Sequence, residues 1–207
     1  MIITDNDILL LREKIRPYLK EKRYSHTLAV ERECRRLGEL LLPDSVTKLR
    51  ASALLHDITK KADKEKQLKY CEEFGIIINN SDLRSPKLFH AKTAAALISR
   101  DFPEFSDEEI ISGVRYHTTG REGMTMFEAI VYLADYIEET RTFPDCVRLR
   151  EFFWGGISSG EEPIGHFYKT MVLSFDMTVK GLIEDRAPID RDTVEARNYF
   201  LSLDAGI

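Results

Sequence analysis

Apolar side chains recur every three or four residues along almost the whole chain, and this spacing most constrains the fold. It places them on one face of an α-helix, whereas a half-buried strand would need strict alternation. The segments with this period are residues 6–21, 25–42, 45–61, 62–75, 109–117, 126–141 and 165–185, with further helices expected from about 86 and from 190 onward. The sequence therefore predicts an all-α protein.

Three side-chain signals indicate where helices begin. Ser25 stands where the second segment needs an N-cap, because a hydroxyl there accepts a hydrogen bond from a free backbone N–H. Ser106 with Glu109, and Thr125 with Glu128, have the spacing of a capping box. Each pair predicts that a helix starts directly after its Ser or Thr.

Other residues indicate where helices bend or end. Pro17 is expected to bend the first helix, and Gly75 is a typical C-terminal glycine after residues 62–74. The β-branched run at 76–80 is too isolated to predict a sheet. Residues 142–163, which include the sequence WGGISSGEE, form the one long loop that we expect.

The composition is that of a folded protein without a membrane span. The chain has 207 residues, of which 43% are hydrophobic and 31% charged, and no apolar run approaches ~18 residues. The N-terminus carries acids ahead of a short apolar stretch, unlike a secretory signal. Cys34, Cys71 and Cys146 are odd in number and lack CxxC spacing, so we expect reduced thiols in a cytoplasmic protein. The net charge of -5 argues against a nucleic acid polymer as partner.

Six ionisable residues fall on the apolar faces of these helices. His26, for example, lies on the stripe of Val30 and Leu37, and Asp135 continues that of Val131. The six come from five different segments and are His26, His56, Asp57, His90, His117 and Asp135. Burying so many ionisable groups is costly unless they have a common partner.

A single inward histidine is more often a hydrogen-bonded core residue than a ligand, and His166 keeps that interpretation. Six together are satisfied most simply by a divalent metal. One ion could take His26, His56, Asp57 and Asp135, and a second could take His90 and His117, with Asp57 as a bridge. Imidazole and carboxylate ligands without thiolate suit iron, manganese, cobalt or zinc.

The order of these residues resembles the HD superfamily of metal-dependent phosphohydrolases. More narrowly, RYSHTLAV, ALLHDITK, LFHAKTAA, VRYHTTGREGMT, IVYLADYIEETR and DTVEARNYFL are similar to the YqeK-type symmetrical diadenosine tetraphosphate hydrolases, which yield two ADP. The resemblance implies one HD domain over residues 1–207, a helical bundle with the metal site in its core. Its core would span about 23–141, with C-terminal helices at about 163–203 packed on it. Iron is the first choice of metal.

The resemblance also adds weight to roles for residues near the six ligands. Asp57 and Lys60 are expected to be catalytic. The residues expected to bind the phosphates of a dinucleoside polyphosphate are Arg23, Ser25, Lys60, His90, His117, Thr118 and Arg141. Two features depart from the family pattern: segment 143–163 is longer and richer in Gly and Ser, and Lys61 doubles the expected lysine.

Two other functions remain open at this point. Relatives with the same metal core act on nucleoside monophosphates or guanosine alarmones, and others are non-catalytic nucleotide sensors that have lost ligands. The complete ligand set favours an enzyme. Phe152, Phe153 and Trp154, if exposed, would suit the interface of a homodimer.

Overall fold

The structure is a computed structural model that describes residues 3–78 and 83–206. This part of the chain is helical and contains no strand, which confirms the all-α prediction. Its elements, with η for 3₁₀-helices, are α1 (Asp5–Ile15), η1 (Arg16–Tyr18), α2 (Glu21–Leu41), η2 (Pro43–Ser45), α3 (Val46–Leu55), α4 (Lys64–Glu73), η3 (Pro86–Leu88), α6 (Phe89–Asp101), η4 (Pro103–Phe105), α7 (Glu108–Tyr116), α8 (Met126–Ile137), α9 (Pro144–Ser158), α10 (Pro163–Glu184) and α11 (Arg191–Asp204). None of the described helices has the length and apolarity needed to cross a membrane.

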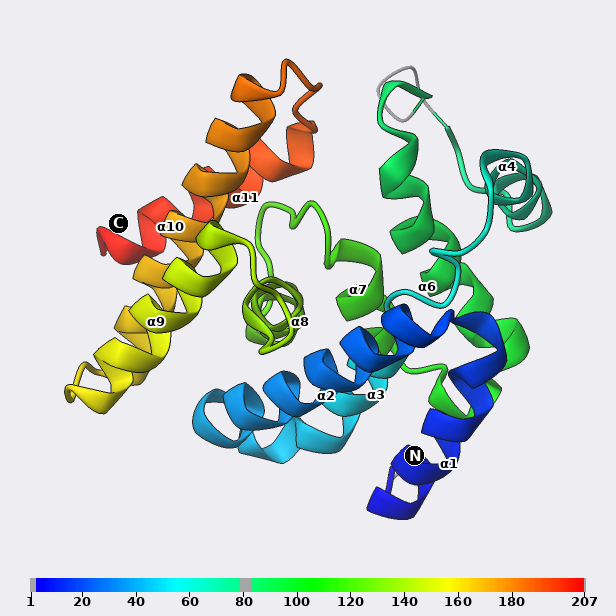
Figure 1. Cartoon of the computed structure of the whole chain (residues 1–207), viewed down its shortest axis with the longest axis horizontal. Helices are drawn as coiled ribbons and strands as arrows, with labels where there is room; N and C mark the ends of the chain where they lie inside the picture. Colours follow the sequence, from blue (N-terminus) through cyan, green and yellow to red (C-terminus); the bar gives the residue numbers. More distant parts are fainter. Residues whose placement is uncertain (1–2, 79–82, 207) are drawn as a thin grey trace.

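Helix α8 lies between the two halves of the molecule (Figure 1). It packs against α2, α3 and α7 on one side and against α9 and α10 on the other. Its sequence, MFEAIVYLADYI, is apolar nearly all round, as expected of a helix covered on all sides. Helix α3 is similarly enclosed by α1, α2, α7 and α8. The polar residues near the ends of these two helices are therefore held in a rigid core.

Two of the expected helix starts are wrong. Helix α2 begins one turn early, at Glu21, so Ser25 lies inside it and its hydroxyl donates to the Glu21 carbonyl. Helix α7 is capped by Asp107, whose side chain accepts from the Glu109 N–H, and Ser106 does not cap it. A carboxylate is as good an N-cap as a hydroxyl, and Asp107 is one residue closer.

Two of the other boundary predictions are confirmed. Thr125 and Glu128 form the expected capping box at α8. Gly75 follows α4 with φ +63°, the left-handed conformation that glycine adopts most easily. Helix α1 ends at Ile15 and Pro17 lies in η1, so Pro17 does not bend one continuous helix. Of the 76–80 run, residues 79 and 80 lie outside the described part, and 76–78 have no regular structure.

The largest correction concerns residues 142–163, which we expected to be one long loop and most of which form helix α9 (Pro144–Ser158). Pro144 occupies its first turn, where a missing N–H costs nothing. Cys146, Leu149 and Phe153 then recur at helical spacing and are buried. This apolar stripe outweighs the low helix propensity of the glycines that follow.

Two of the three aromatic residues of α9, Phe153 and Trp154, pack against the rest of the molecule. Phe153 is fully buried, and the Trp154 ring donates its Nε1–H to Glu33 at 2.6 Å. Of the three expected interface residues only Phe152 is exposed, at 40%. The exposed aromatic surface is therefore smaller than expected, and the homodimer stays a prediction.

His166 and the three cysteines have the structural environments expected of them. The His166 ring is buried, with Nε2 3.1 Å from the Phe152 carbonyl, and is thus a hydrogen-bonded core histidine. Cys34, Cys71 and Cys146 are buried and form no disulfide.

Candidate metal centre

Three helices and two turns bring the six inward residues together. His26 lies on α2, His90 in the first turn of α6 and Asp135 on α8. Helix α3 ends at Leu55, so His56 and Asp57 lie in the turn that follows it, and His117 likewise directly follows α7. All six are buried apart from Asp135, whose side chain remains 17% exposed.

A repeated local contact orients three of the four histidines. His56, His90 and His117 each place Nδ1 against the backbone carbonyl three residues earlier, at 2.6, 2.6 and 2.7 Å. A carbonyl can only accept, so Nδ1 carries the proton and donates it. Nε2 is then left with its lone pair, as a metal ligand requires.

His26 obtains the same orientation from a side chain. Its Nδ1 lies 3.0 Å from Oε1 of Glu138, which is fully buried at the C-terminal end of α8. Glu138 in turn accepts from the hydroxyl of Thr140 at 2.8 Å. A carboxylate behind a ligating imidazole fixes the ring and raises its basicity.

The inward-facing atoms lie within a few ångströms of one another. His26 Nε2 is 3.0 Å from Asp135 Oδ1, and His56 Nε2 is 3.4 Å from Asp57 Oδ2. The other oxygen of Asp57 is 3.2 Å from His90 Nε2, which is itself 3.1 Å from His117 Nε2. Three combinations of these residues have ligand atoms within 4.8 Å of one another, and Asp57 takes part in two of them.

Unsatisfied atoms show that this centre fits a cation. His26 Nε2, His56 Nε2 and Asp57 Oδ1 are buried without a hydrogen-bond partner among the described residues. Each such atom costs about 1–3 kcal/mol. The 3.0 Å approach of His26 Nε2 to Asp135 lacks hydrogen-bond geometry, so it does not remove the problem. A divalent ion would satisfy all three atoms at once.

Electrostatics favour the protonation states of metal ligands at three of these residues. Burial acts to raise the pKa of Asp57, but the neighbouring His56 and His90 hold it well below its usual value. The pKa of Asp135 is also lowered well below normal, because Arg141 and the histidines outweigh burial. Burial and the two facing imidazoles keep the pKa of His117 well below 6.5. The carboxylates are thus ionised and His117 is neutral.

His26 is different, because protons compete for it. Burial lowers its pKa, but the neighbouring carboxylates of Asp135 and Glu138 outweigh that effect and raise the pKa to about 9. Without a metal His26 is therefore protonated at neutral pH. An ion bound at Nε2 would have to displace that proton.

Three cationic side chains contact the carboxylates from the edge of the centre. Arg23 Nη1 lies 2.9 Å from Asp57 Oδ2, and Arg141 Nη2 lies 2.7 Å from Asp135 Oδ1. Lys60 Nζ is 2.9 Å from His90 Nε2 and 3.7 Å from Asp57 Oδ1. All three remain partly exposed, so they can also reach an anion that arrives from solvent.

A hydrogen-bond network holds the turn that carries Asp57 and Lys60. The Thr59 hydroxyl donates to the His90 carbonyl at 2.9 Å, and Gln67 of α4 donates to the Thr59 carbonyl at 2.7 Å. Thr93 donates to the other end of the Gln67 amide at 2.5 Å. This buried network joins the turn, α4 and α6 into one unit.

Two further expected phosphate-binding residues differ in their placement. Ser25 is exposed and bonds only its own helix, so no described contact links it to the centre. Thr118 directly follows His117, and its buried hydroxyl has no partner among the described residues. It lines a cavity of about 390 Å³ between the η3 region and helices α10 and α11. Lys87, which also lines this cavity, provides the carbonyl that holds His90.

Sequence reasoning missed Glu138 and Arg150. Glu138 continues the inward stripe of α8 three residues after Asp135, so its position could have been recognised. Arg150 donates to the carbonyls of Ile137 and Arg141 and thereby fixes the segment that carries Arg141. It lies on α9, in the segment expected to be a loop.

The comparisons with known proteins agree with this fold. Residues 23–140 match the model of the HD domain family, and the chain belongs to that family. Within it, the chain is 30% identical to the symmetrical bis(5'-nucleosyl)-tetraphosphatase of Bacillus subtilis (strain 168), over 91% of this chain and 94% of that protein. The enzyme of the same description from Staphylococcus aureus (strain NCTC 8325 / PS 47) is also 30% identical, over 88% of each chain.

A solved structure shares the whole architecture. The crystal structure of a predicted HD superfamily hydrolase involved in NAD metabolism from Clostridium acetobutylicum has a TM-score of 0.82 and 30% identity, covering 98% of this chain and 100% of that one. The likeness extends through α9–α11 and is not confined to the part matched by the family model.

Proposed function

We propose that this chain is a metal-dependent hydrolase that cleaves diadenosine tetraphosphate symmetrically into two ADP. The observation that carries the proposal is the convergence of six imidazole and carboxylate groups with three unsatisfied buried atoms. Relatives that match this chain over nearly their full length and bear the name symmetrical bis(5'-nucleosyl)-tetraphosphatase support the choice of substrate.

The short distances between these residues support the ligand assignment made from the sequence. His26, His56, Asp57 and Asp135 would hold one ion; His90 and His117 would hold a second, with Asp57 between them. A bound divalent metal lowers the pKa of water and so supplies hydroxide near neutral pH. Iron is our first choice, with manganese, cobalt and zinc as alternatives that the same ligand types accept.

The chain's own cations would bind and orient the tetraphosphate. Arg23, Lys60 and Arg141 stand partly exposed around the buried carboxylates, so phosphate oxygens can replace carboxylate oxygens as their partners. In the reaction, the water oxygen forms a bond to one inner phosphorus. The bond from that phosphorus to the central bridging oxygen breaks, and the bridging oxygen leaves with the second ADP. Lys60 is placed to stabilise the charge that develops there.

The cavity beside Thr118 would hold one nucleoside half of the substrate. Its walls combine threonine hydroxyls with apolar groups from η3, from α10 and from the segment between α10 and α11. We therefore propose that residues 1–207 act as one HD domain, in which the core of about 23–141 carries the metal and the C-terminal helices at about 163–203 complete the substrate site.

The test is product analysis with isotope-labelled water. The protein is purified without oxygen, loaded with Fe(II) or Mn(II), and given diadenosine tetraphosphate in ¹⁸O-water. We expect ADP alone, with one label in the β-phosphate of half of the ADP molecules. AMP plus ATP would keep the hydrolase and refute symmetric cleavage. If metal-loaded protein leaves the substrate intact, the proposed function is wrong.

Variants at Lys60 and at Lys64 form a matched pair for the same assay. Lys60→Ala should lower kcat about 100-fold, because one charge-stabilising donor near the reacting phosphate is lost. Lys64→Ala removes an exposed lysine from α4 and should leave kcat unchanged. Equal rates in the two variants would remove Lys60 from the catalytic set.

A further inference from the structure

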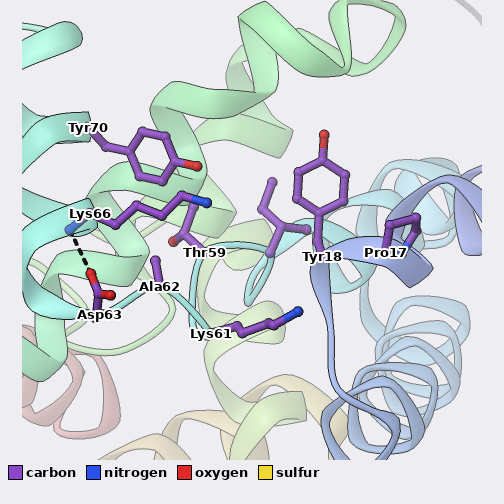
Figure 2. A pocket seen from close by; sticks show the side chains of 9 residues that line it. Pro17, Tyr18, Thr59, Lys61, Ala62, Asp63, Lys66 and Tyr70 are labelled. Atoms are coloured by element: carbon purple, nitrogen blue, oxygen red, sulfur yellow. Dashed lines mark hydrogen bonds between the residues drawn. The ribbon is translucent and has the colours of Figure 1, made fainter.

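A second cavity, of about 580 Å³, lies against the turn that follows α3. Its walls come from η1, from residues 58–63 of the turn and from α4 (Figure 2). None of the six metal-centre residues lines it, although Asp57 and Lys60 belong to the same turn as the lining residues Ile58 and Lys61. The turn therefore lies between the metal centre and this cavity.

The charges in this cavity favour an anion. Lys61 and Lys66 are exposed and line it, and neither ammonium group has a carboxylate within salt-bridge distance among the described residues. The one carboxylate in the wall, Asp63, is already engaged, because it caps α4 and accepts from the Lys66 backbone N–H at 2.8 Å. Two cations thus face the cavity without an acidic partner.

The same cavity offers two aromatic rings. Tyr18 and Tyr70 stand on opposite sides of it in Figure 2, and the Lys66 side chain runs beside the Tyr70 ring toward Thr59. The Tyr18 ring packs on Phe102, with centroids 5.4 Å apart, and its hydroxyl donates to Asp101 at 3.2 Å. Its position is therefore fixed before any ligand arrives.

The floor of the cavity is also preformed. Thr59, which lines it, is held by Gln67 on one side and by the His90 carbonyl on the other. A largely preformed cavity of a few hundred Å³ with a few polar groups is the usual form of a small-molecule site.

We propose that this cavity is a second ligand site, separate from the metal centre, and that it binds a nucleoside monophosphate. The phosphate would lie between Lys61 and Lys66, and the base would pack against Tyr18 or Tyr70, since phenol rings stack on the flat face of a base. The doubled lysine at 60–61 then has a physical explanation: Lys60 serves the metal centre and Lys61 serves this site.

Calorimetric titration of AMP into the metal-free, full-length protein tests the charges. We expect the double variant Lys61→Ala/Lys66→Ala to bind AMP at least about tenfold more weakly than the wild type. The matched control Lys64→Ala/Lys69→Ala removes the same charge from exposed positions of α4 outside the cavity, and should stay within about twofold. Equal weakening by both pairs, or no AMP binding by the wild type, would overturn the proposal.

A second measurement tests the rings and the location. The double variant Tyr18→Leu/Tyr70→Leu should bind AMP more weakly but leave the affinity for inorganic phosphate unchanged. If phosphate binds the wild type as tightly as AMP does, the nucleotide assignment fails. Photolabelling with 8-azidoadenosine monophosphate should modify peptides within residues 17–18 or 58–70. Label confined to residues 84–88 or 118–119 would place AMP in the other cavity and refute the second site. Neither measurement involves turnover. A negative result would therefore refute the second site without affecting the proposed hydrolase activity, and loss of the proposed activity would not affect the second site.

Discussion

Helix α2 contributes to two buried clusters of charge, and they differ in one respect. His26 points into the metal centre, whereas Glu31, five residues later, accepts from Arg12 Nε at 2.7 Å and from Arg50 Nε at 2.9 Å. Arg50 also contacts Asp5. Every oxygen of Glu31 has a donor within the protein, while three atoms of the metal centre have none.

This contrast separates a structural ion cluster from a functional one. Both are deeply buried, since the side chains of Glu31 and Asp57 are 1% and 2% exposed. Burial of charge alone therefore does not identify a site. The useful sign is a set of lone pairs that converge and remain unsatisfied, because the protein bears that cost only where a ligand removes it.

The largest effect that we expect comes from removing a group shared by both parts of the metal centre. Asp57→Ala should lower turnover of diadenosine tetraphosphate at least about 10³-fold and reduce bound metal, because the carboxylate proposed to bridge the two ions is lost. The far-UV circular dichroism should remain helical. Metal content by mass spectrometry and kcat are the measurements, with exposed Asp44→Ala as the control. Normal metal content in the Asp57 variant would contradict the ligand assignment.

The matching change in the satisfied cluster should have the opposite profile. Glu31→Ala leaves Arg12 and Arg50 without their shared partner and should lower the free energy of unfolding by about 3 kcal/mol. The metal content of the folded protein should not change. Urea unfolding measures the effect, and Glu39→Ala, which breaks an exposed pair with Arg35 on the same helix, should cost less than about 0.5 kcal/mol. If the Glu31 variant lost metal, metal binding would depend on both clusters and the contrast between them would be wrong.

The two clusters also differ in how far the sequence predicts them. The six inward residues are visible from helical period alone, since each lies on an apolar stripe. Glu31 and Arg50 are not, because charged residues that fall at the edge of a stripe look like solvated ones until the facing helices are placed. Arg150 was missed for another reason: its helix, α9, was expected to be a loop because Gly155 and Gly156 lower the helix propensity.

Boundary errors had little effect on the site, for a physical reason. Helix α3 ends before His56, but the turn that follows still directs His56 and Asp57 inward through local bonds such as that from His56 to the Ala53 carbonyl. Ser25 is the exception. Its expected role depended on lying at a helix N-terminus, and the early start of α2 at Glu21 removes that basis.

Glu138 offers a change that weakens the metal centre without removing a ligand. Glu138→Gln keeps the shape but loses the carboxylate behind His26, so metal affinity should fall between about tenfold and about a hundredfold. The adjacent Glu139→Gln changes an exposed residue that pairs with Arg32 and should leave affinity unchanged. Competition titration with a chelating dye measures both. Equal affinities in the two variants would mean that the His26 ring is held by its packing alone.

The smallest expected effect is a pH dependence that only the unsatisfied cluster should show. In the metal-free protein the pKa of His26 is raised from 6.5 to about 9, because the carboxylates of Asp135 and Glu138 outweigh burial. A raised pKa stabilises the fold fully below pH 6.5, and this stabilisation is lost as the pH rises through 9. We expect the metal-free protein to lose about 2 kcal/mol over that interval.

His26→Gln supplies the control, because it cannot take up the proton. The difference in unfolding free energy between wild type and variant should shrink from pH 6.5 to 9 when both are metal-free. The metal affinity of the wild type should rise over the same interval, because a smaller fraction of the protein then carries the Nε2 proton that a metal ion must displace. Opposite trends for stability and affinity would show that proton and metal compete for one lone pair. Parallel trends would mean that His26 is not a ligand, and the metal centre would then rest on the remaining five residues.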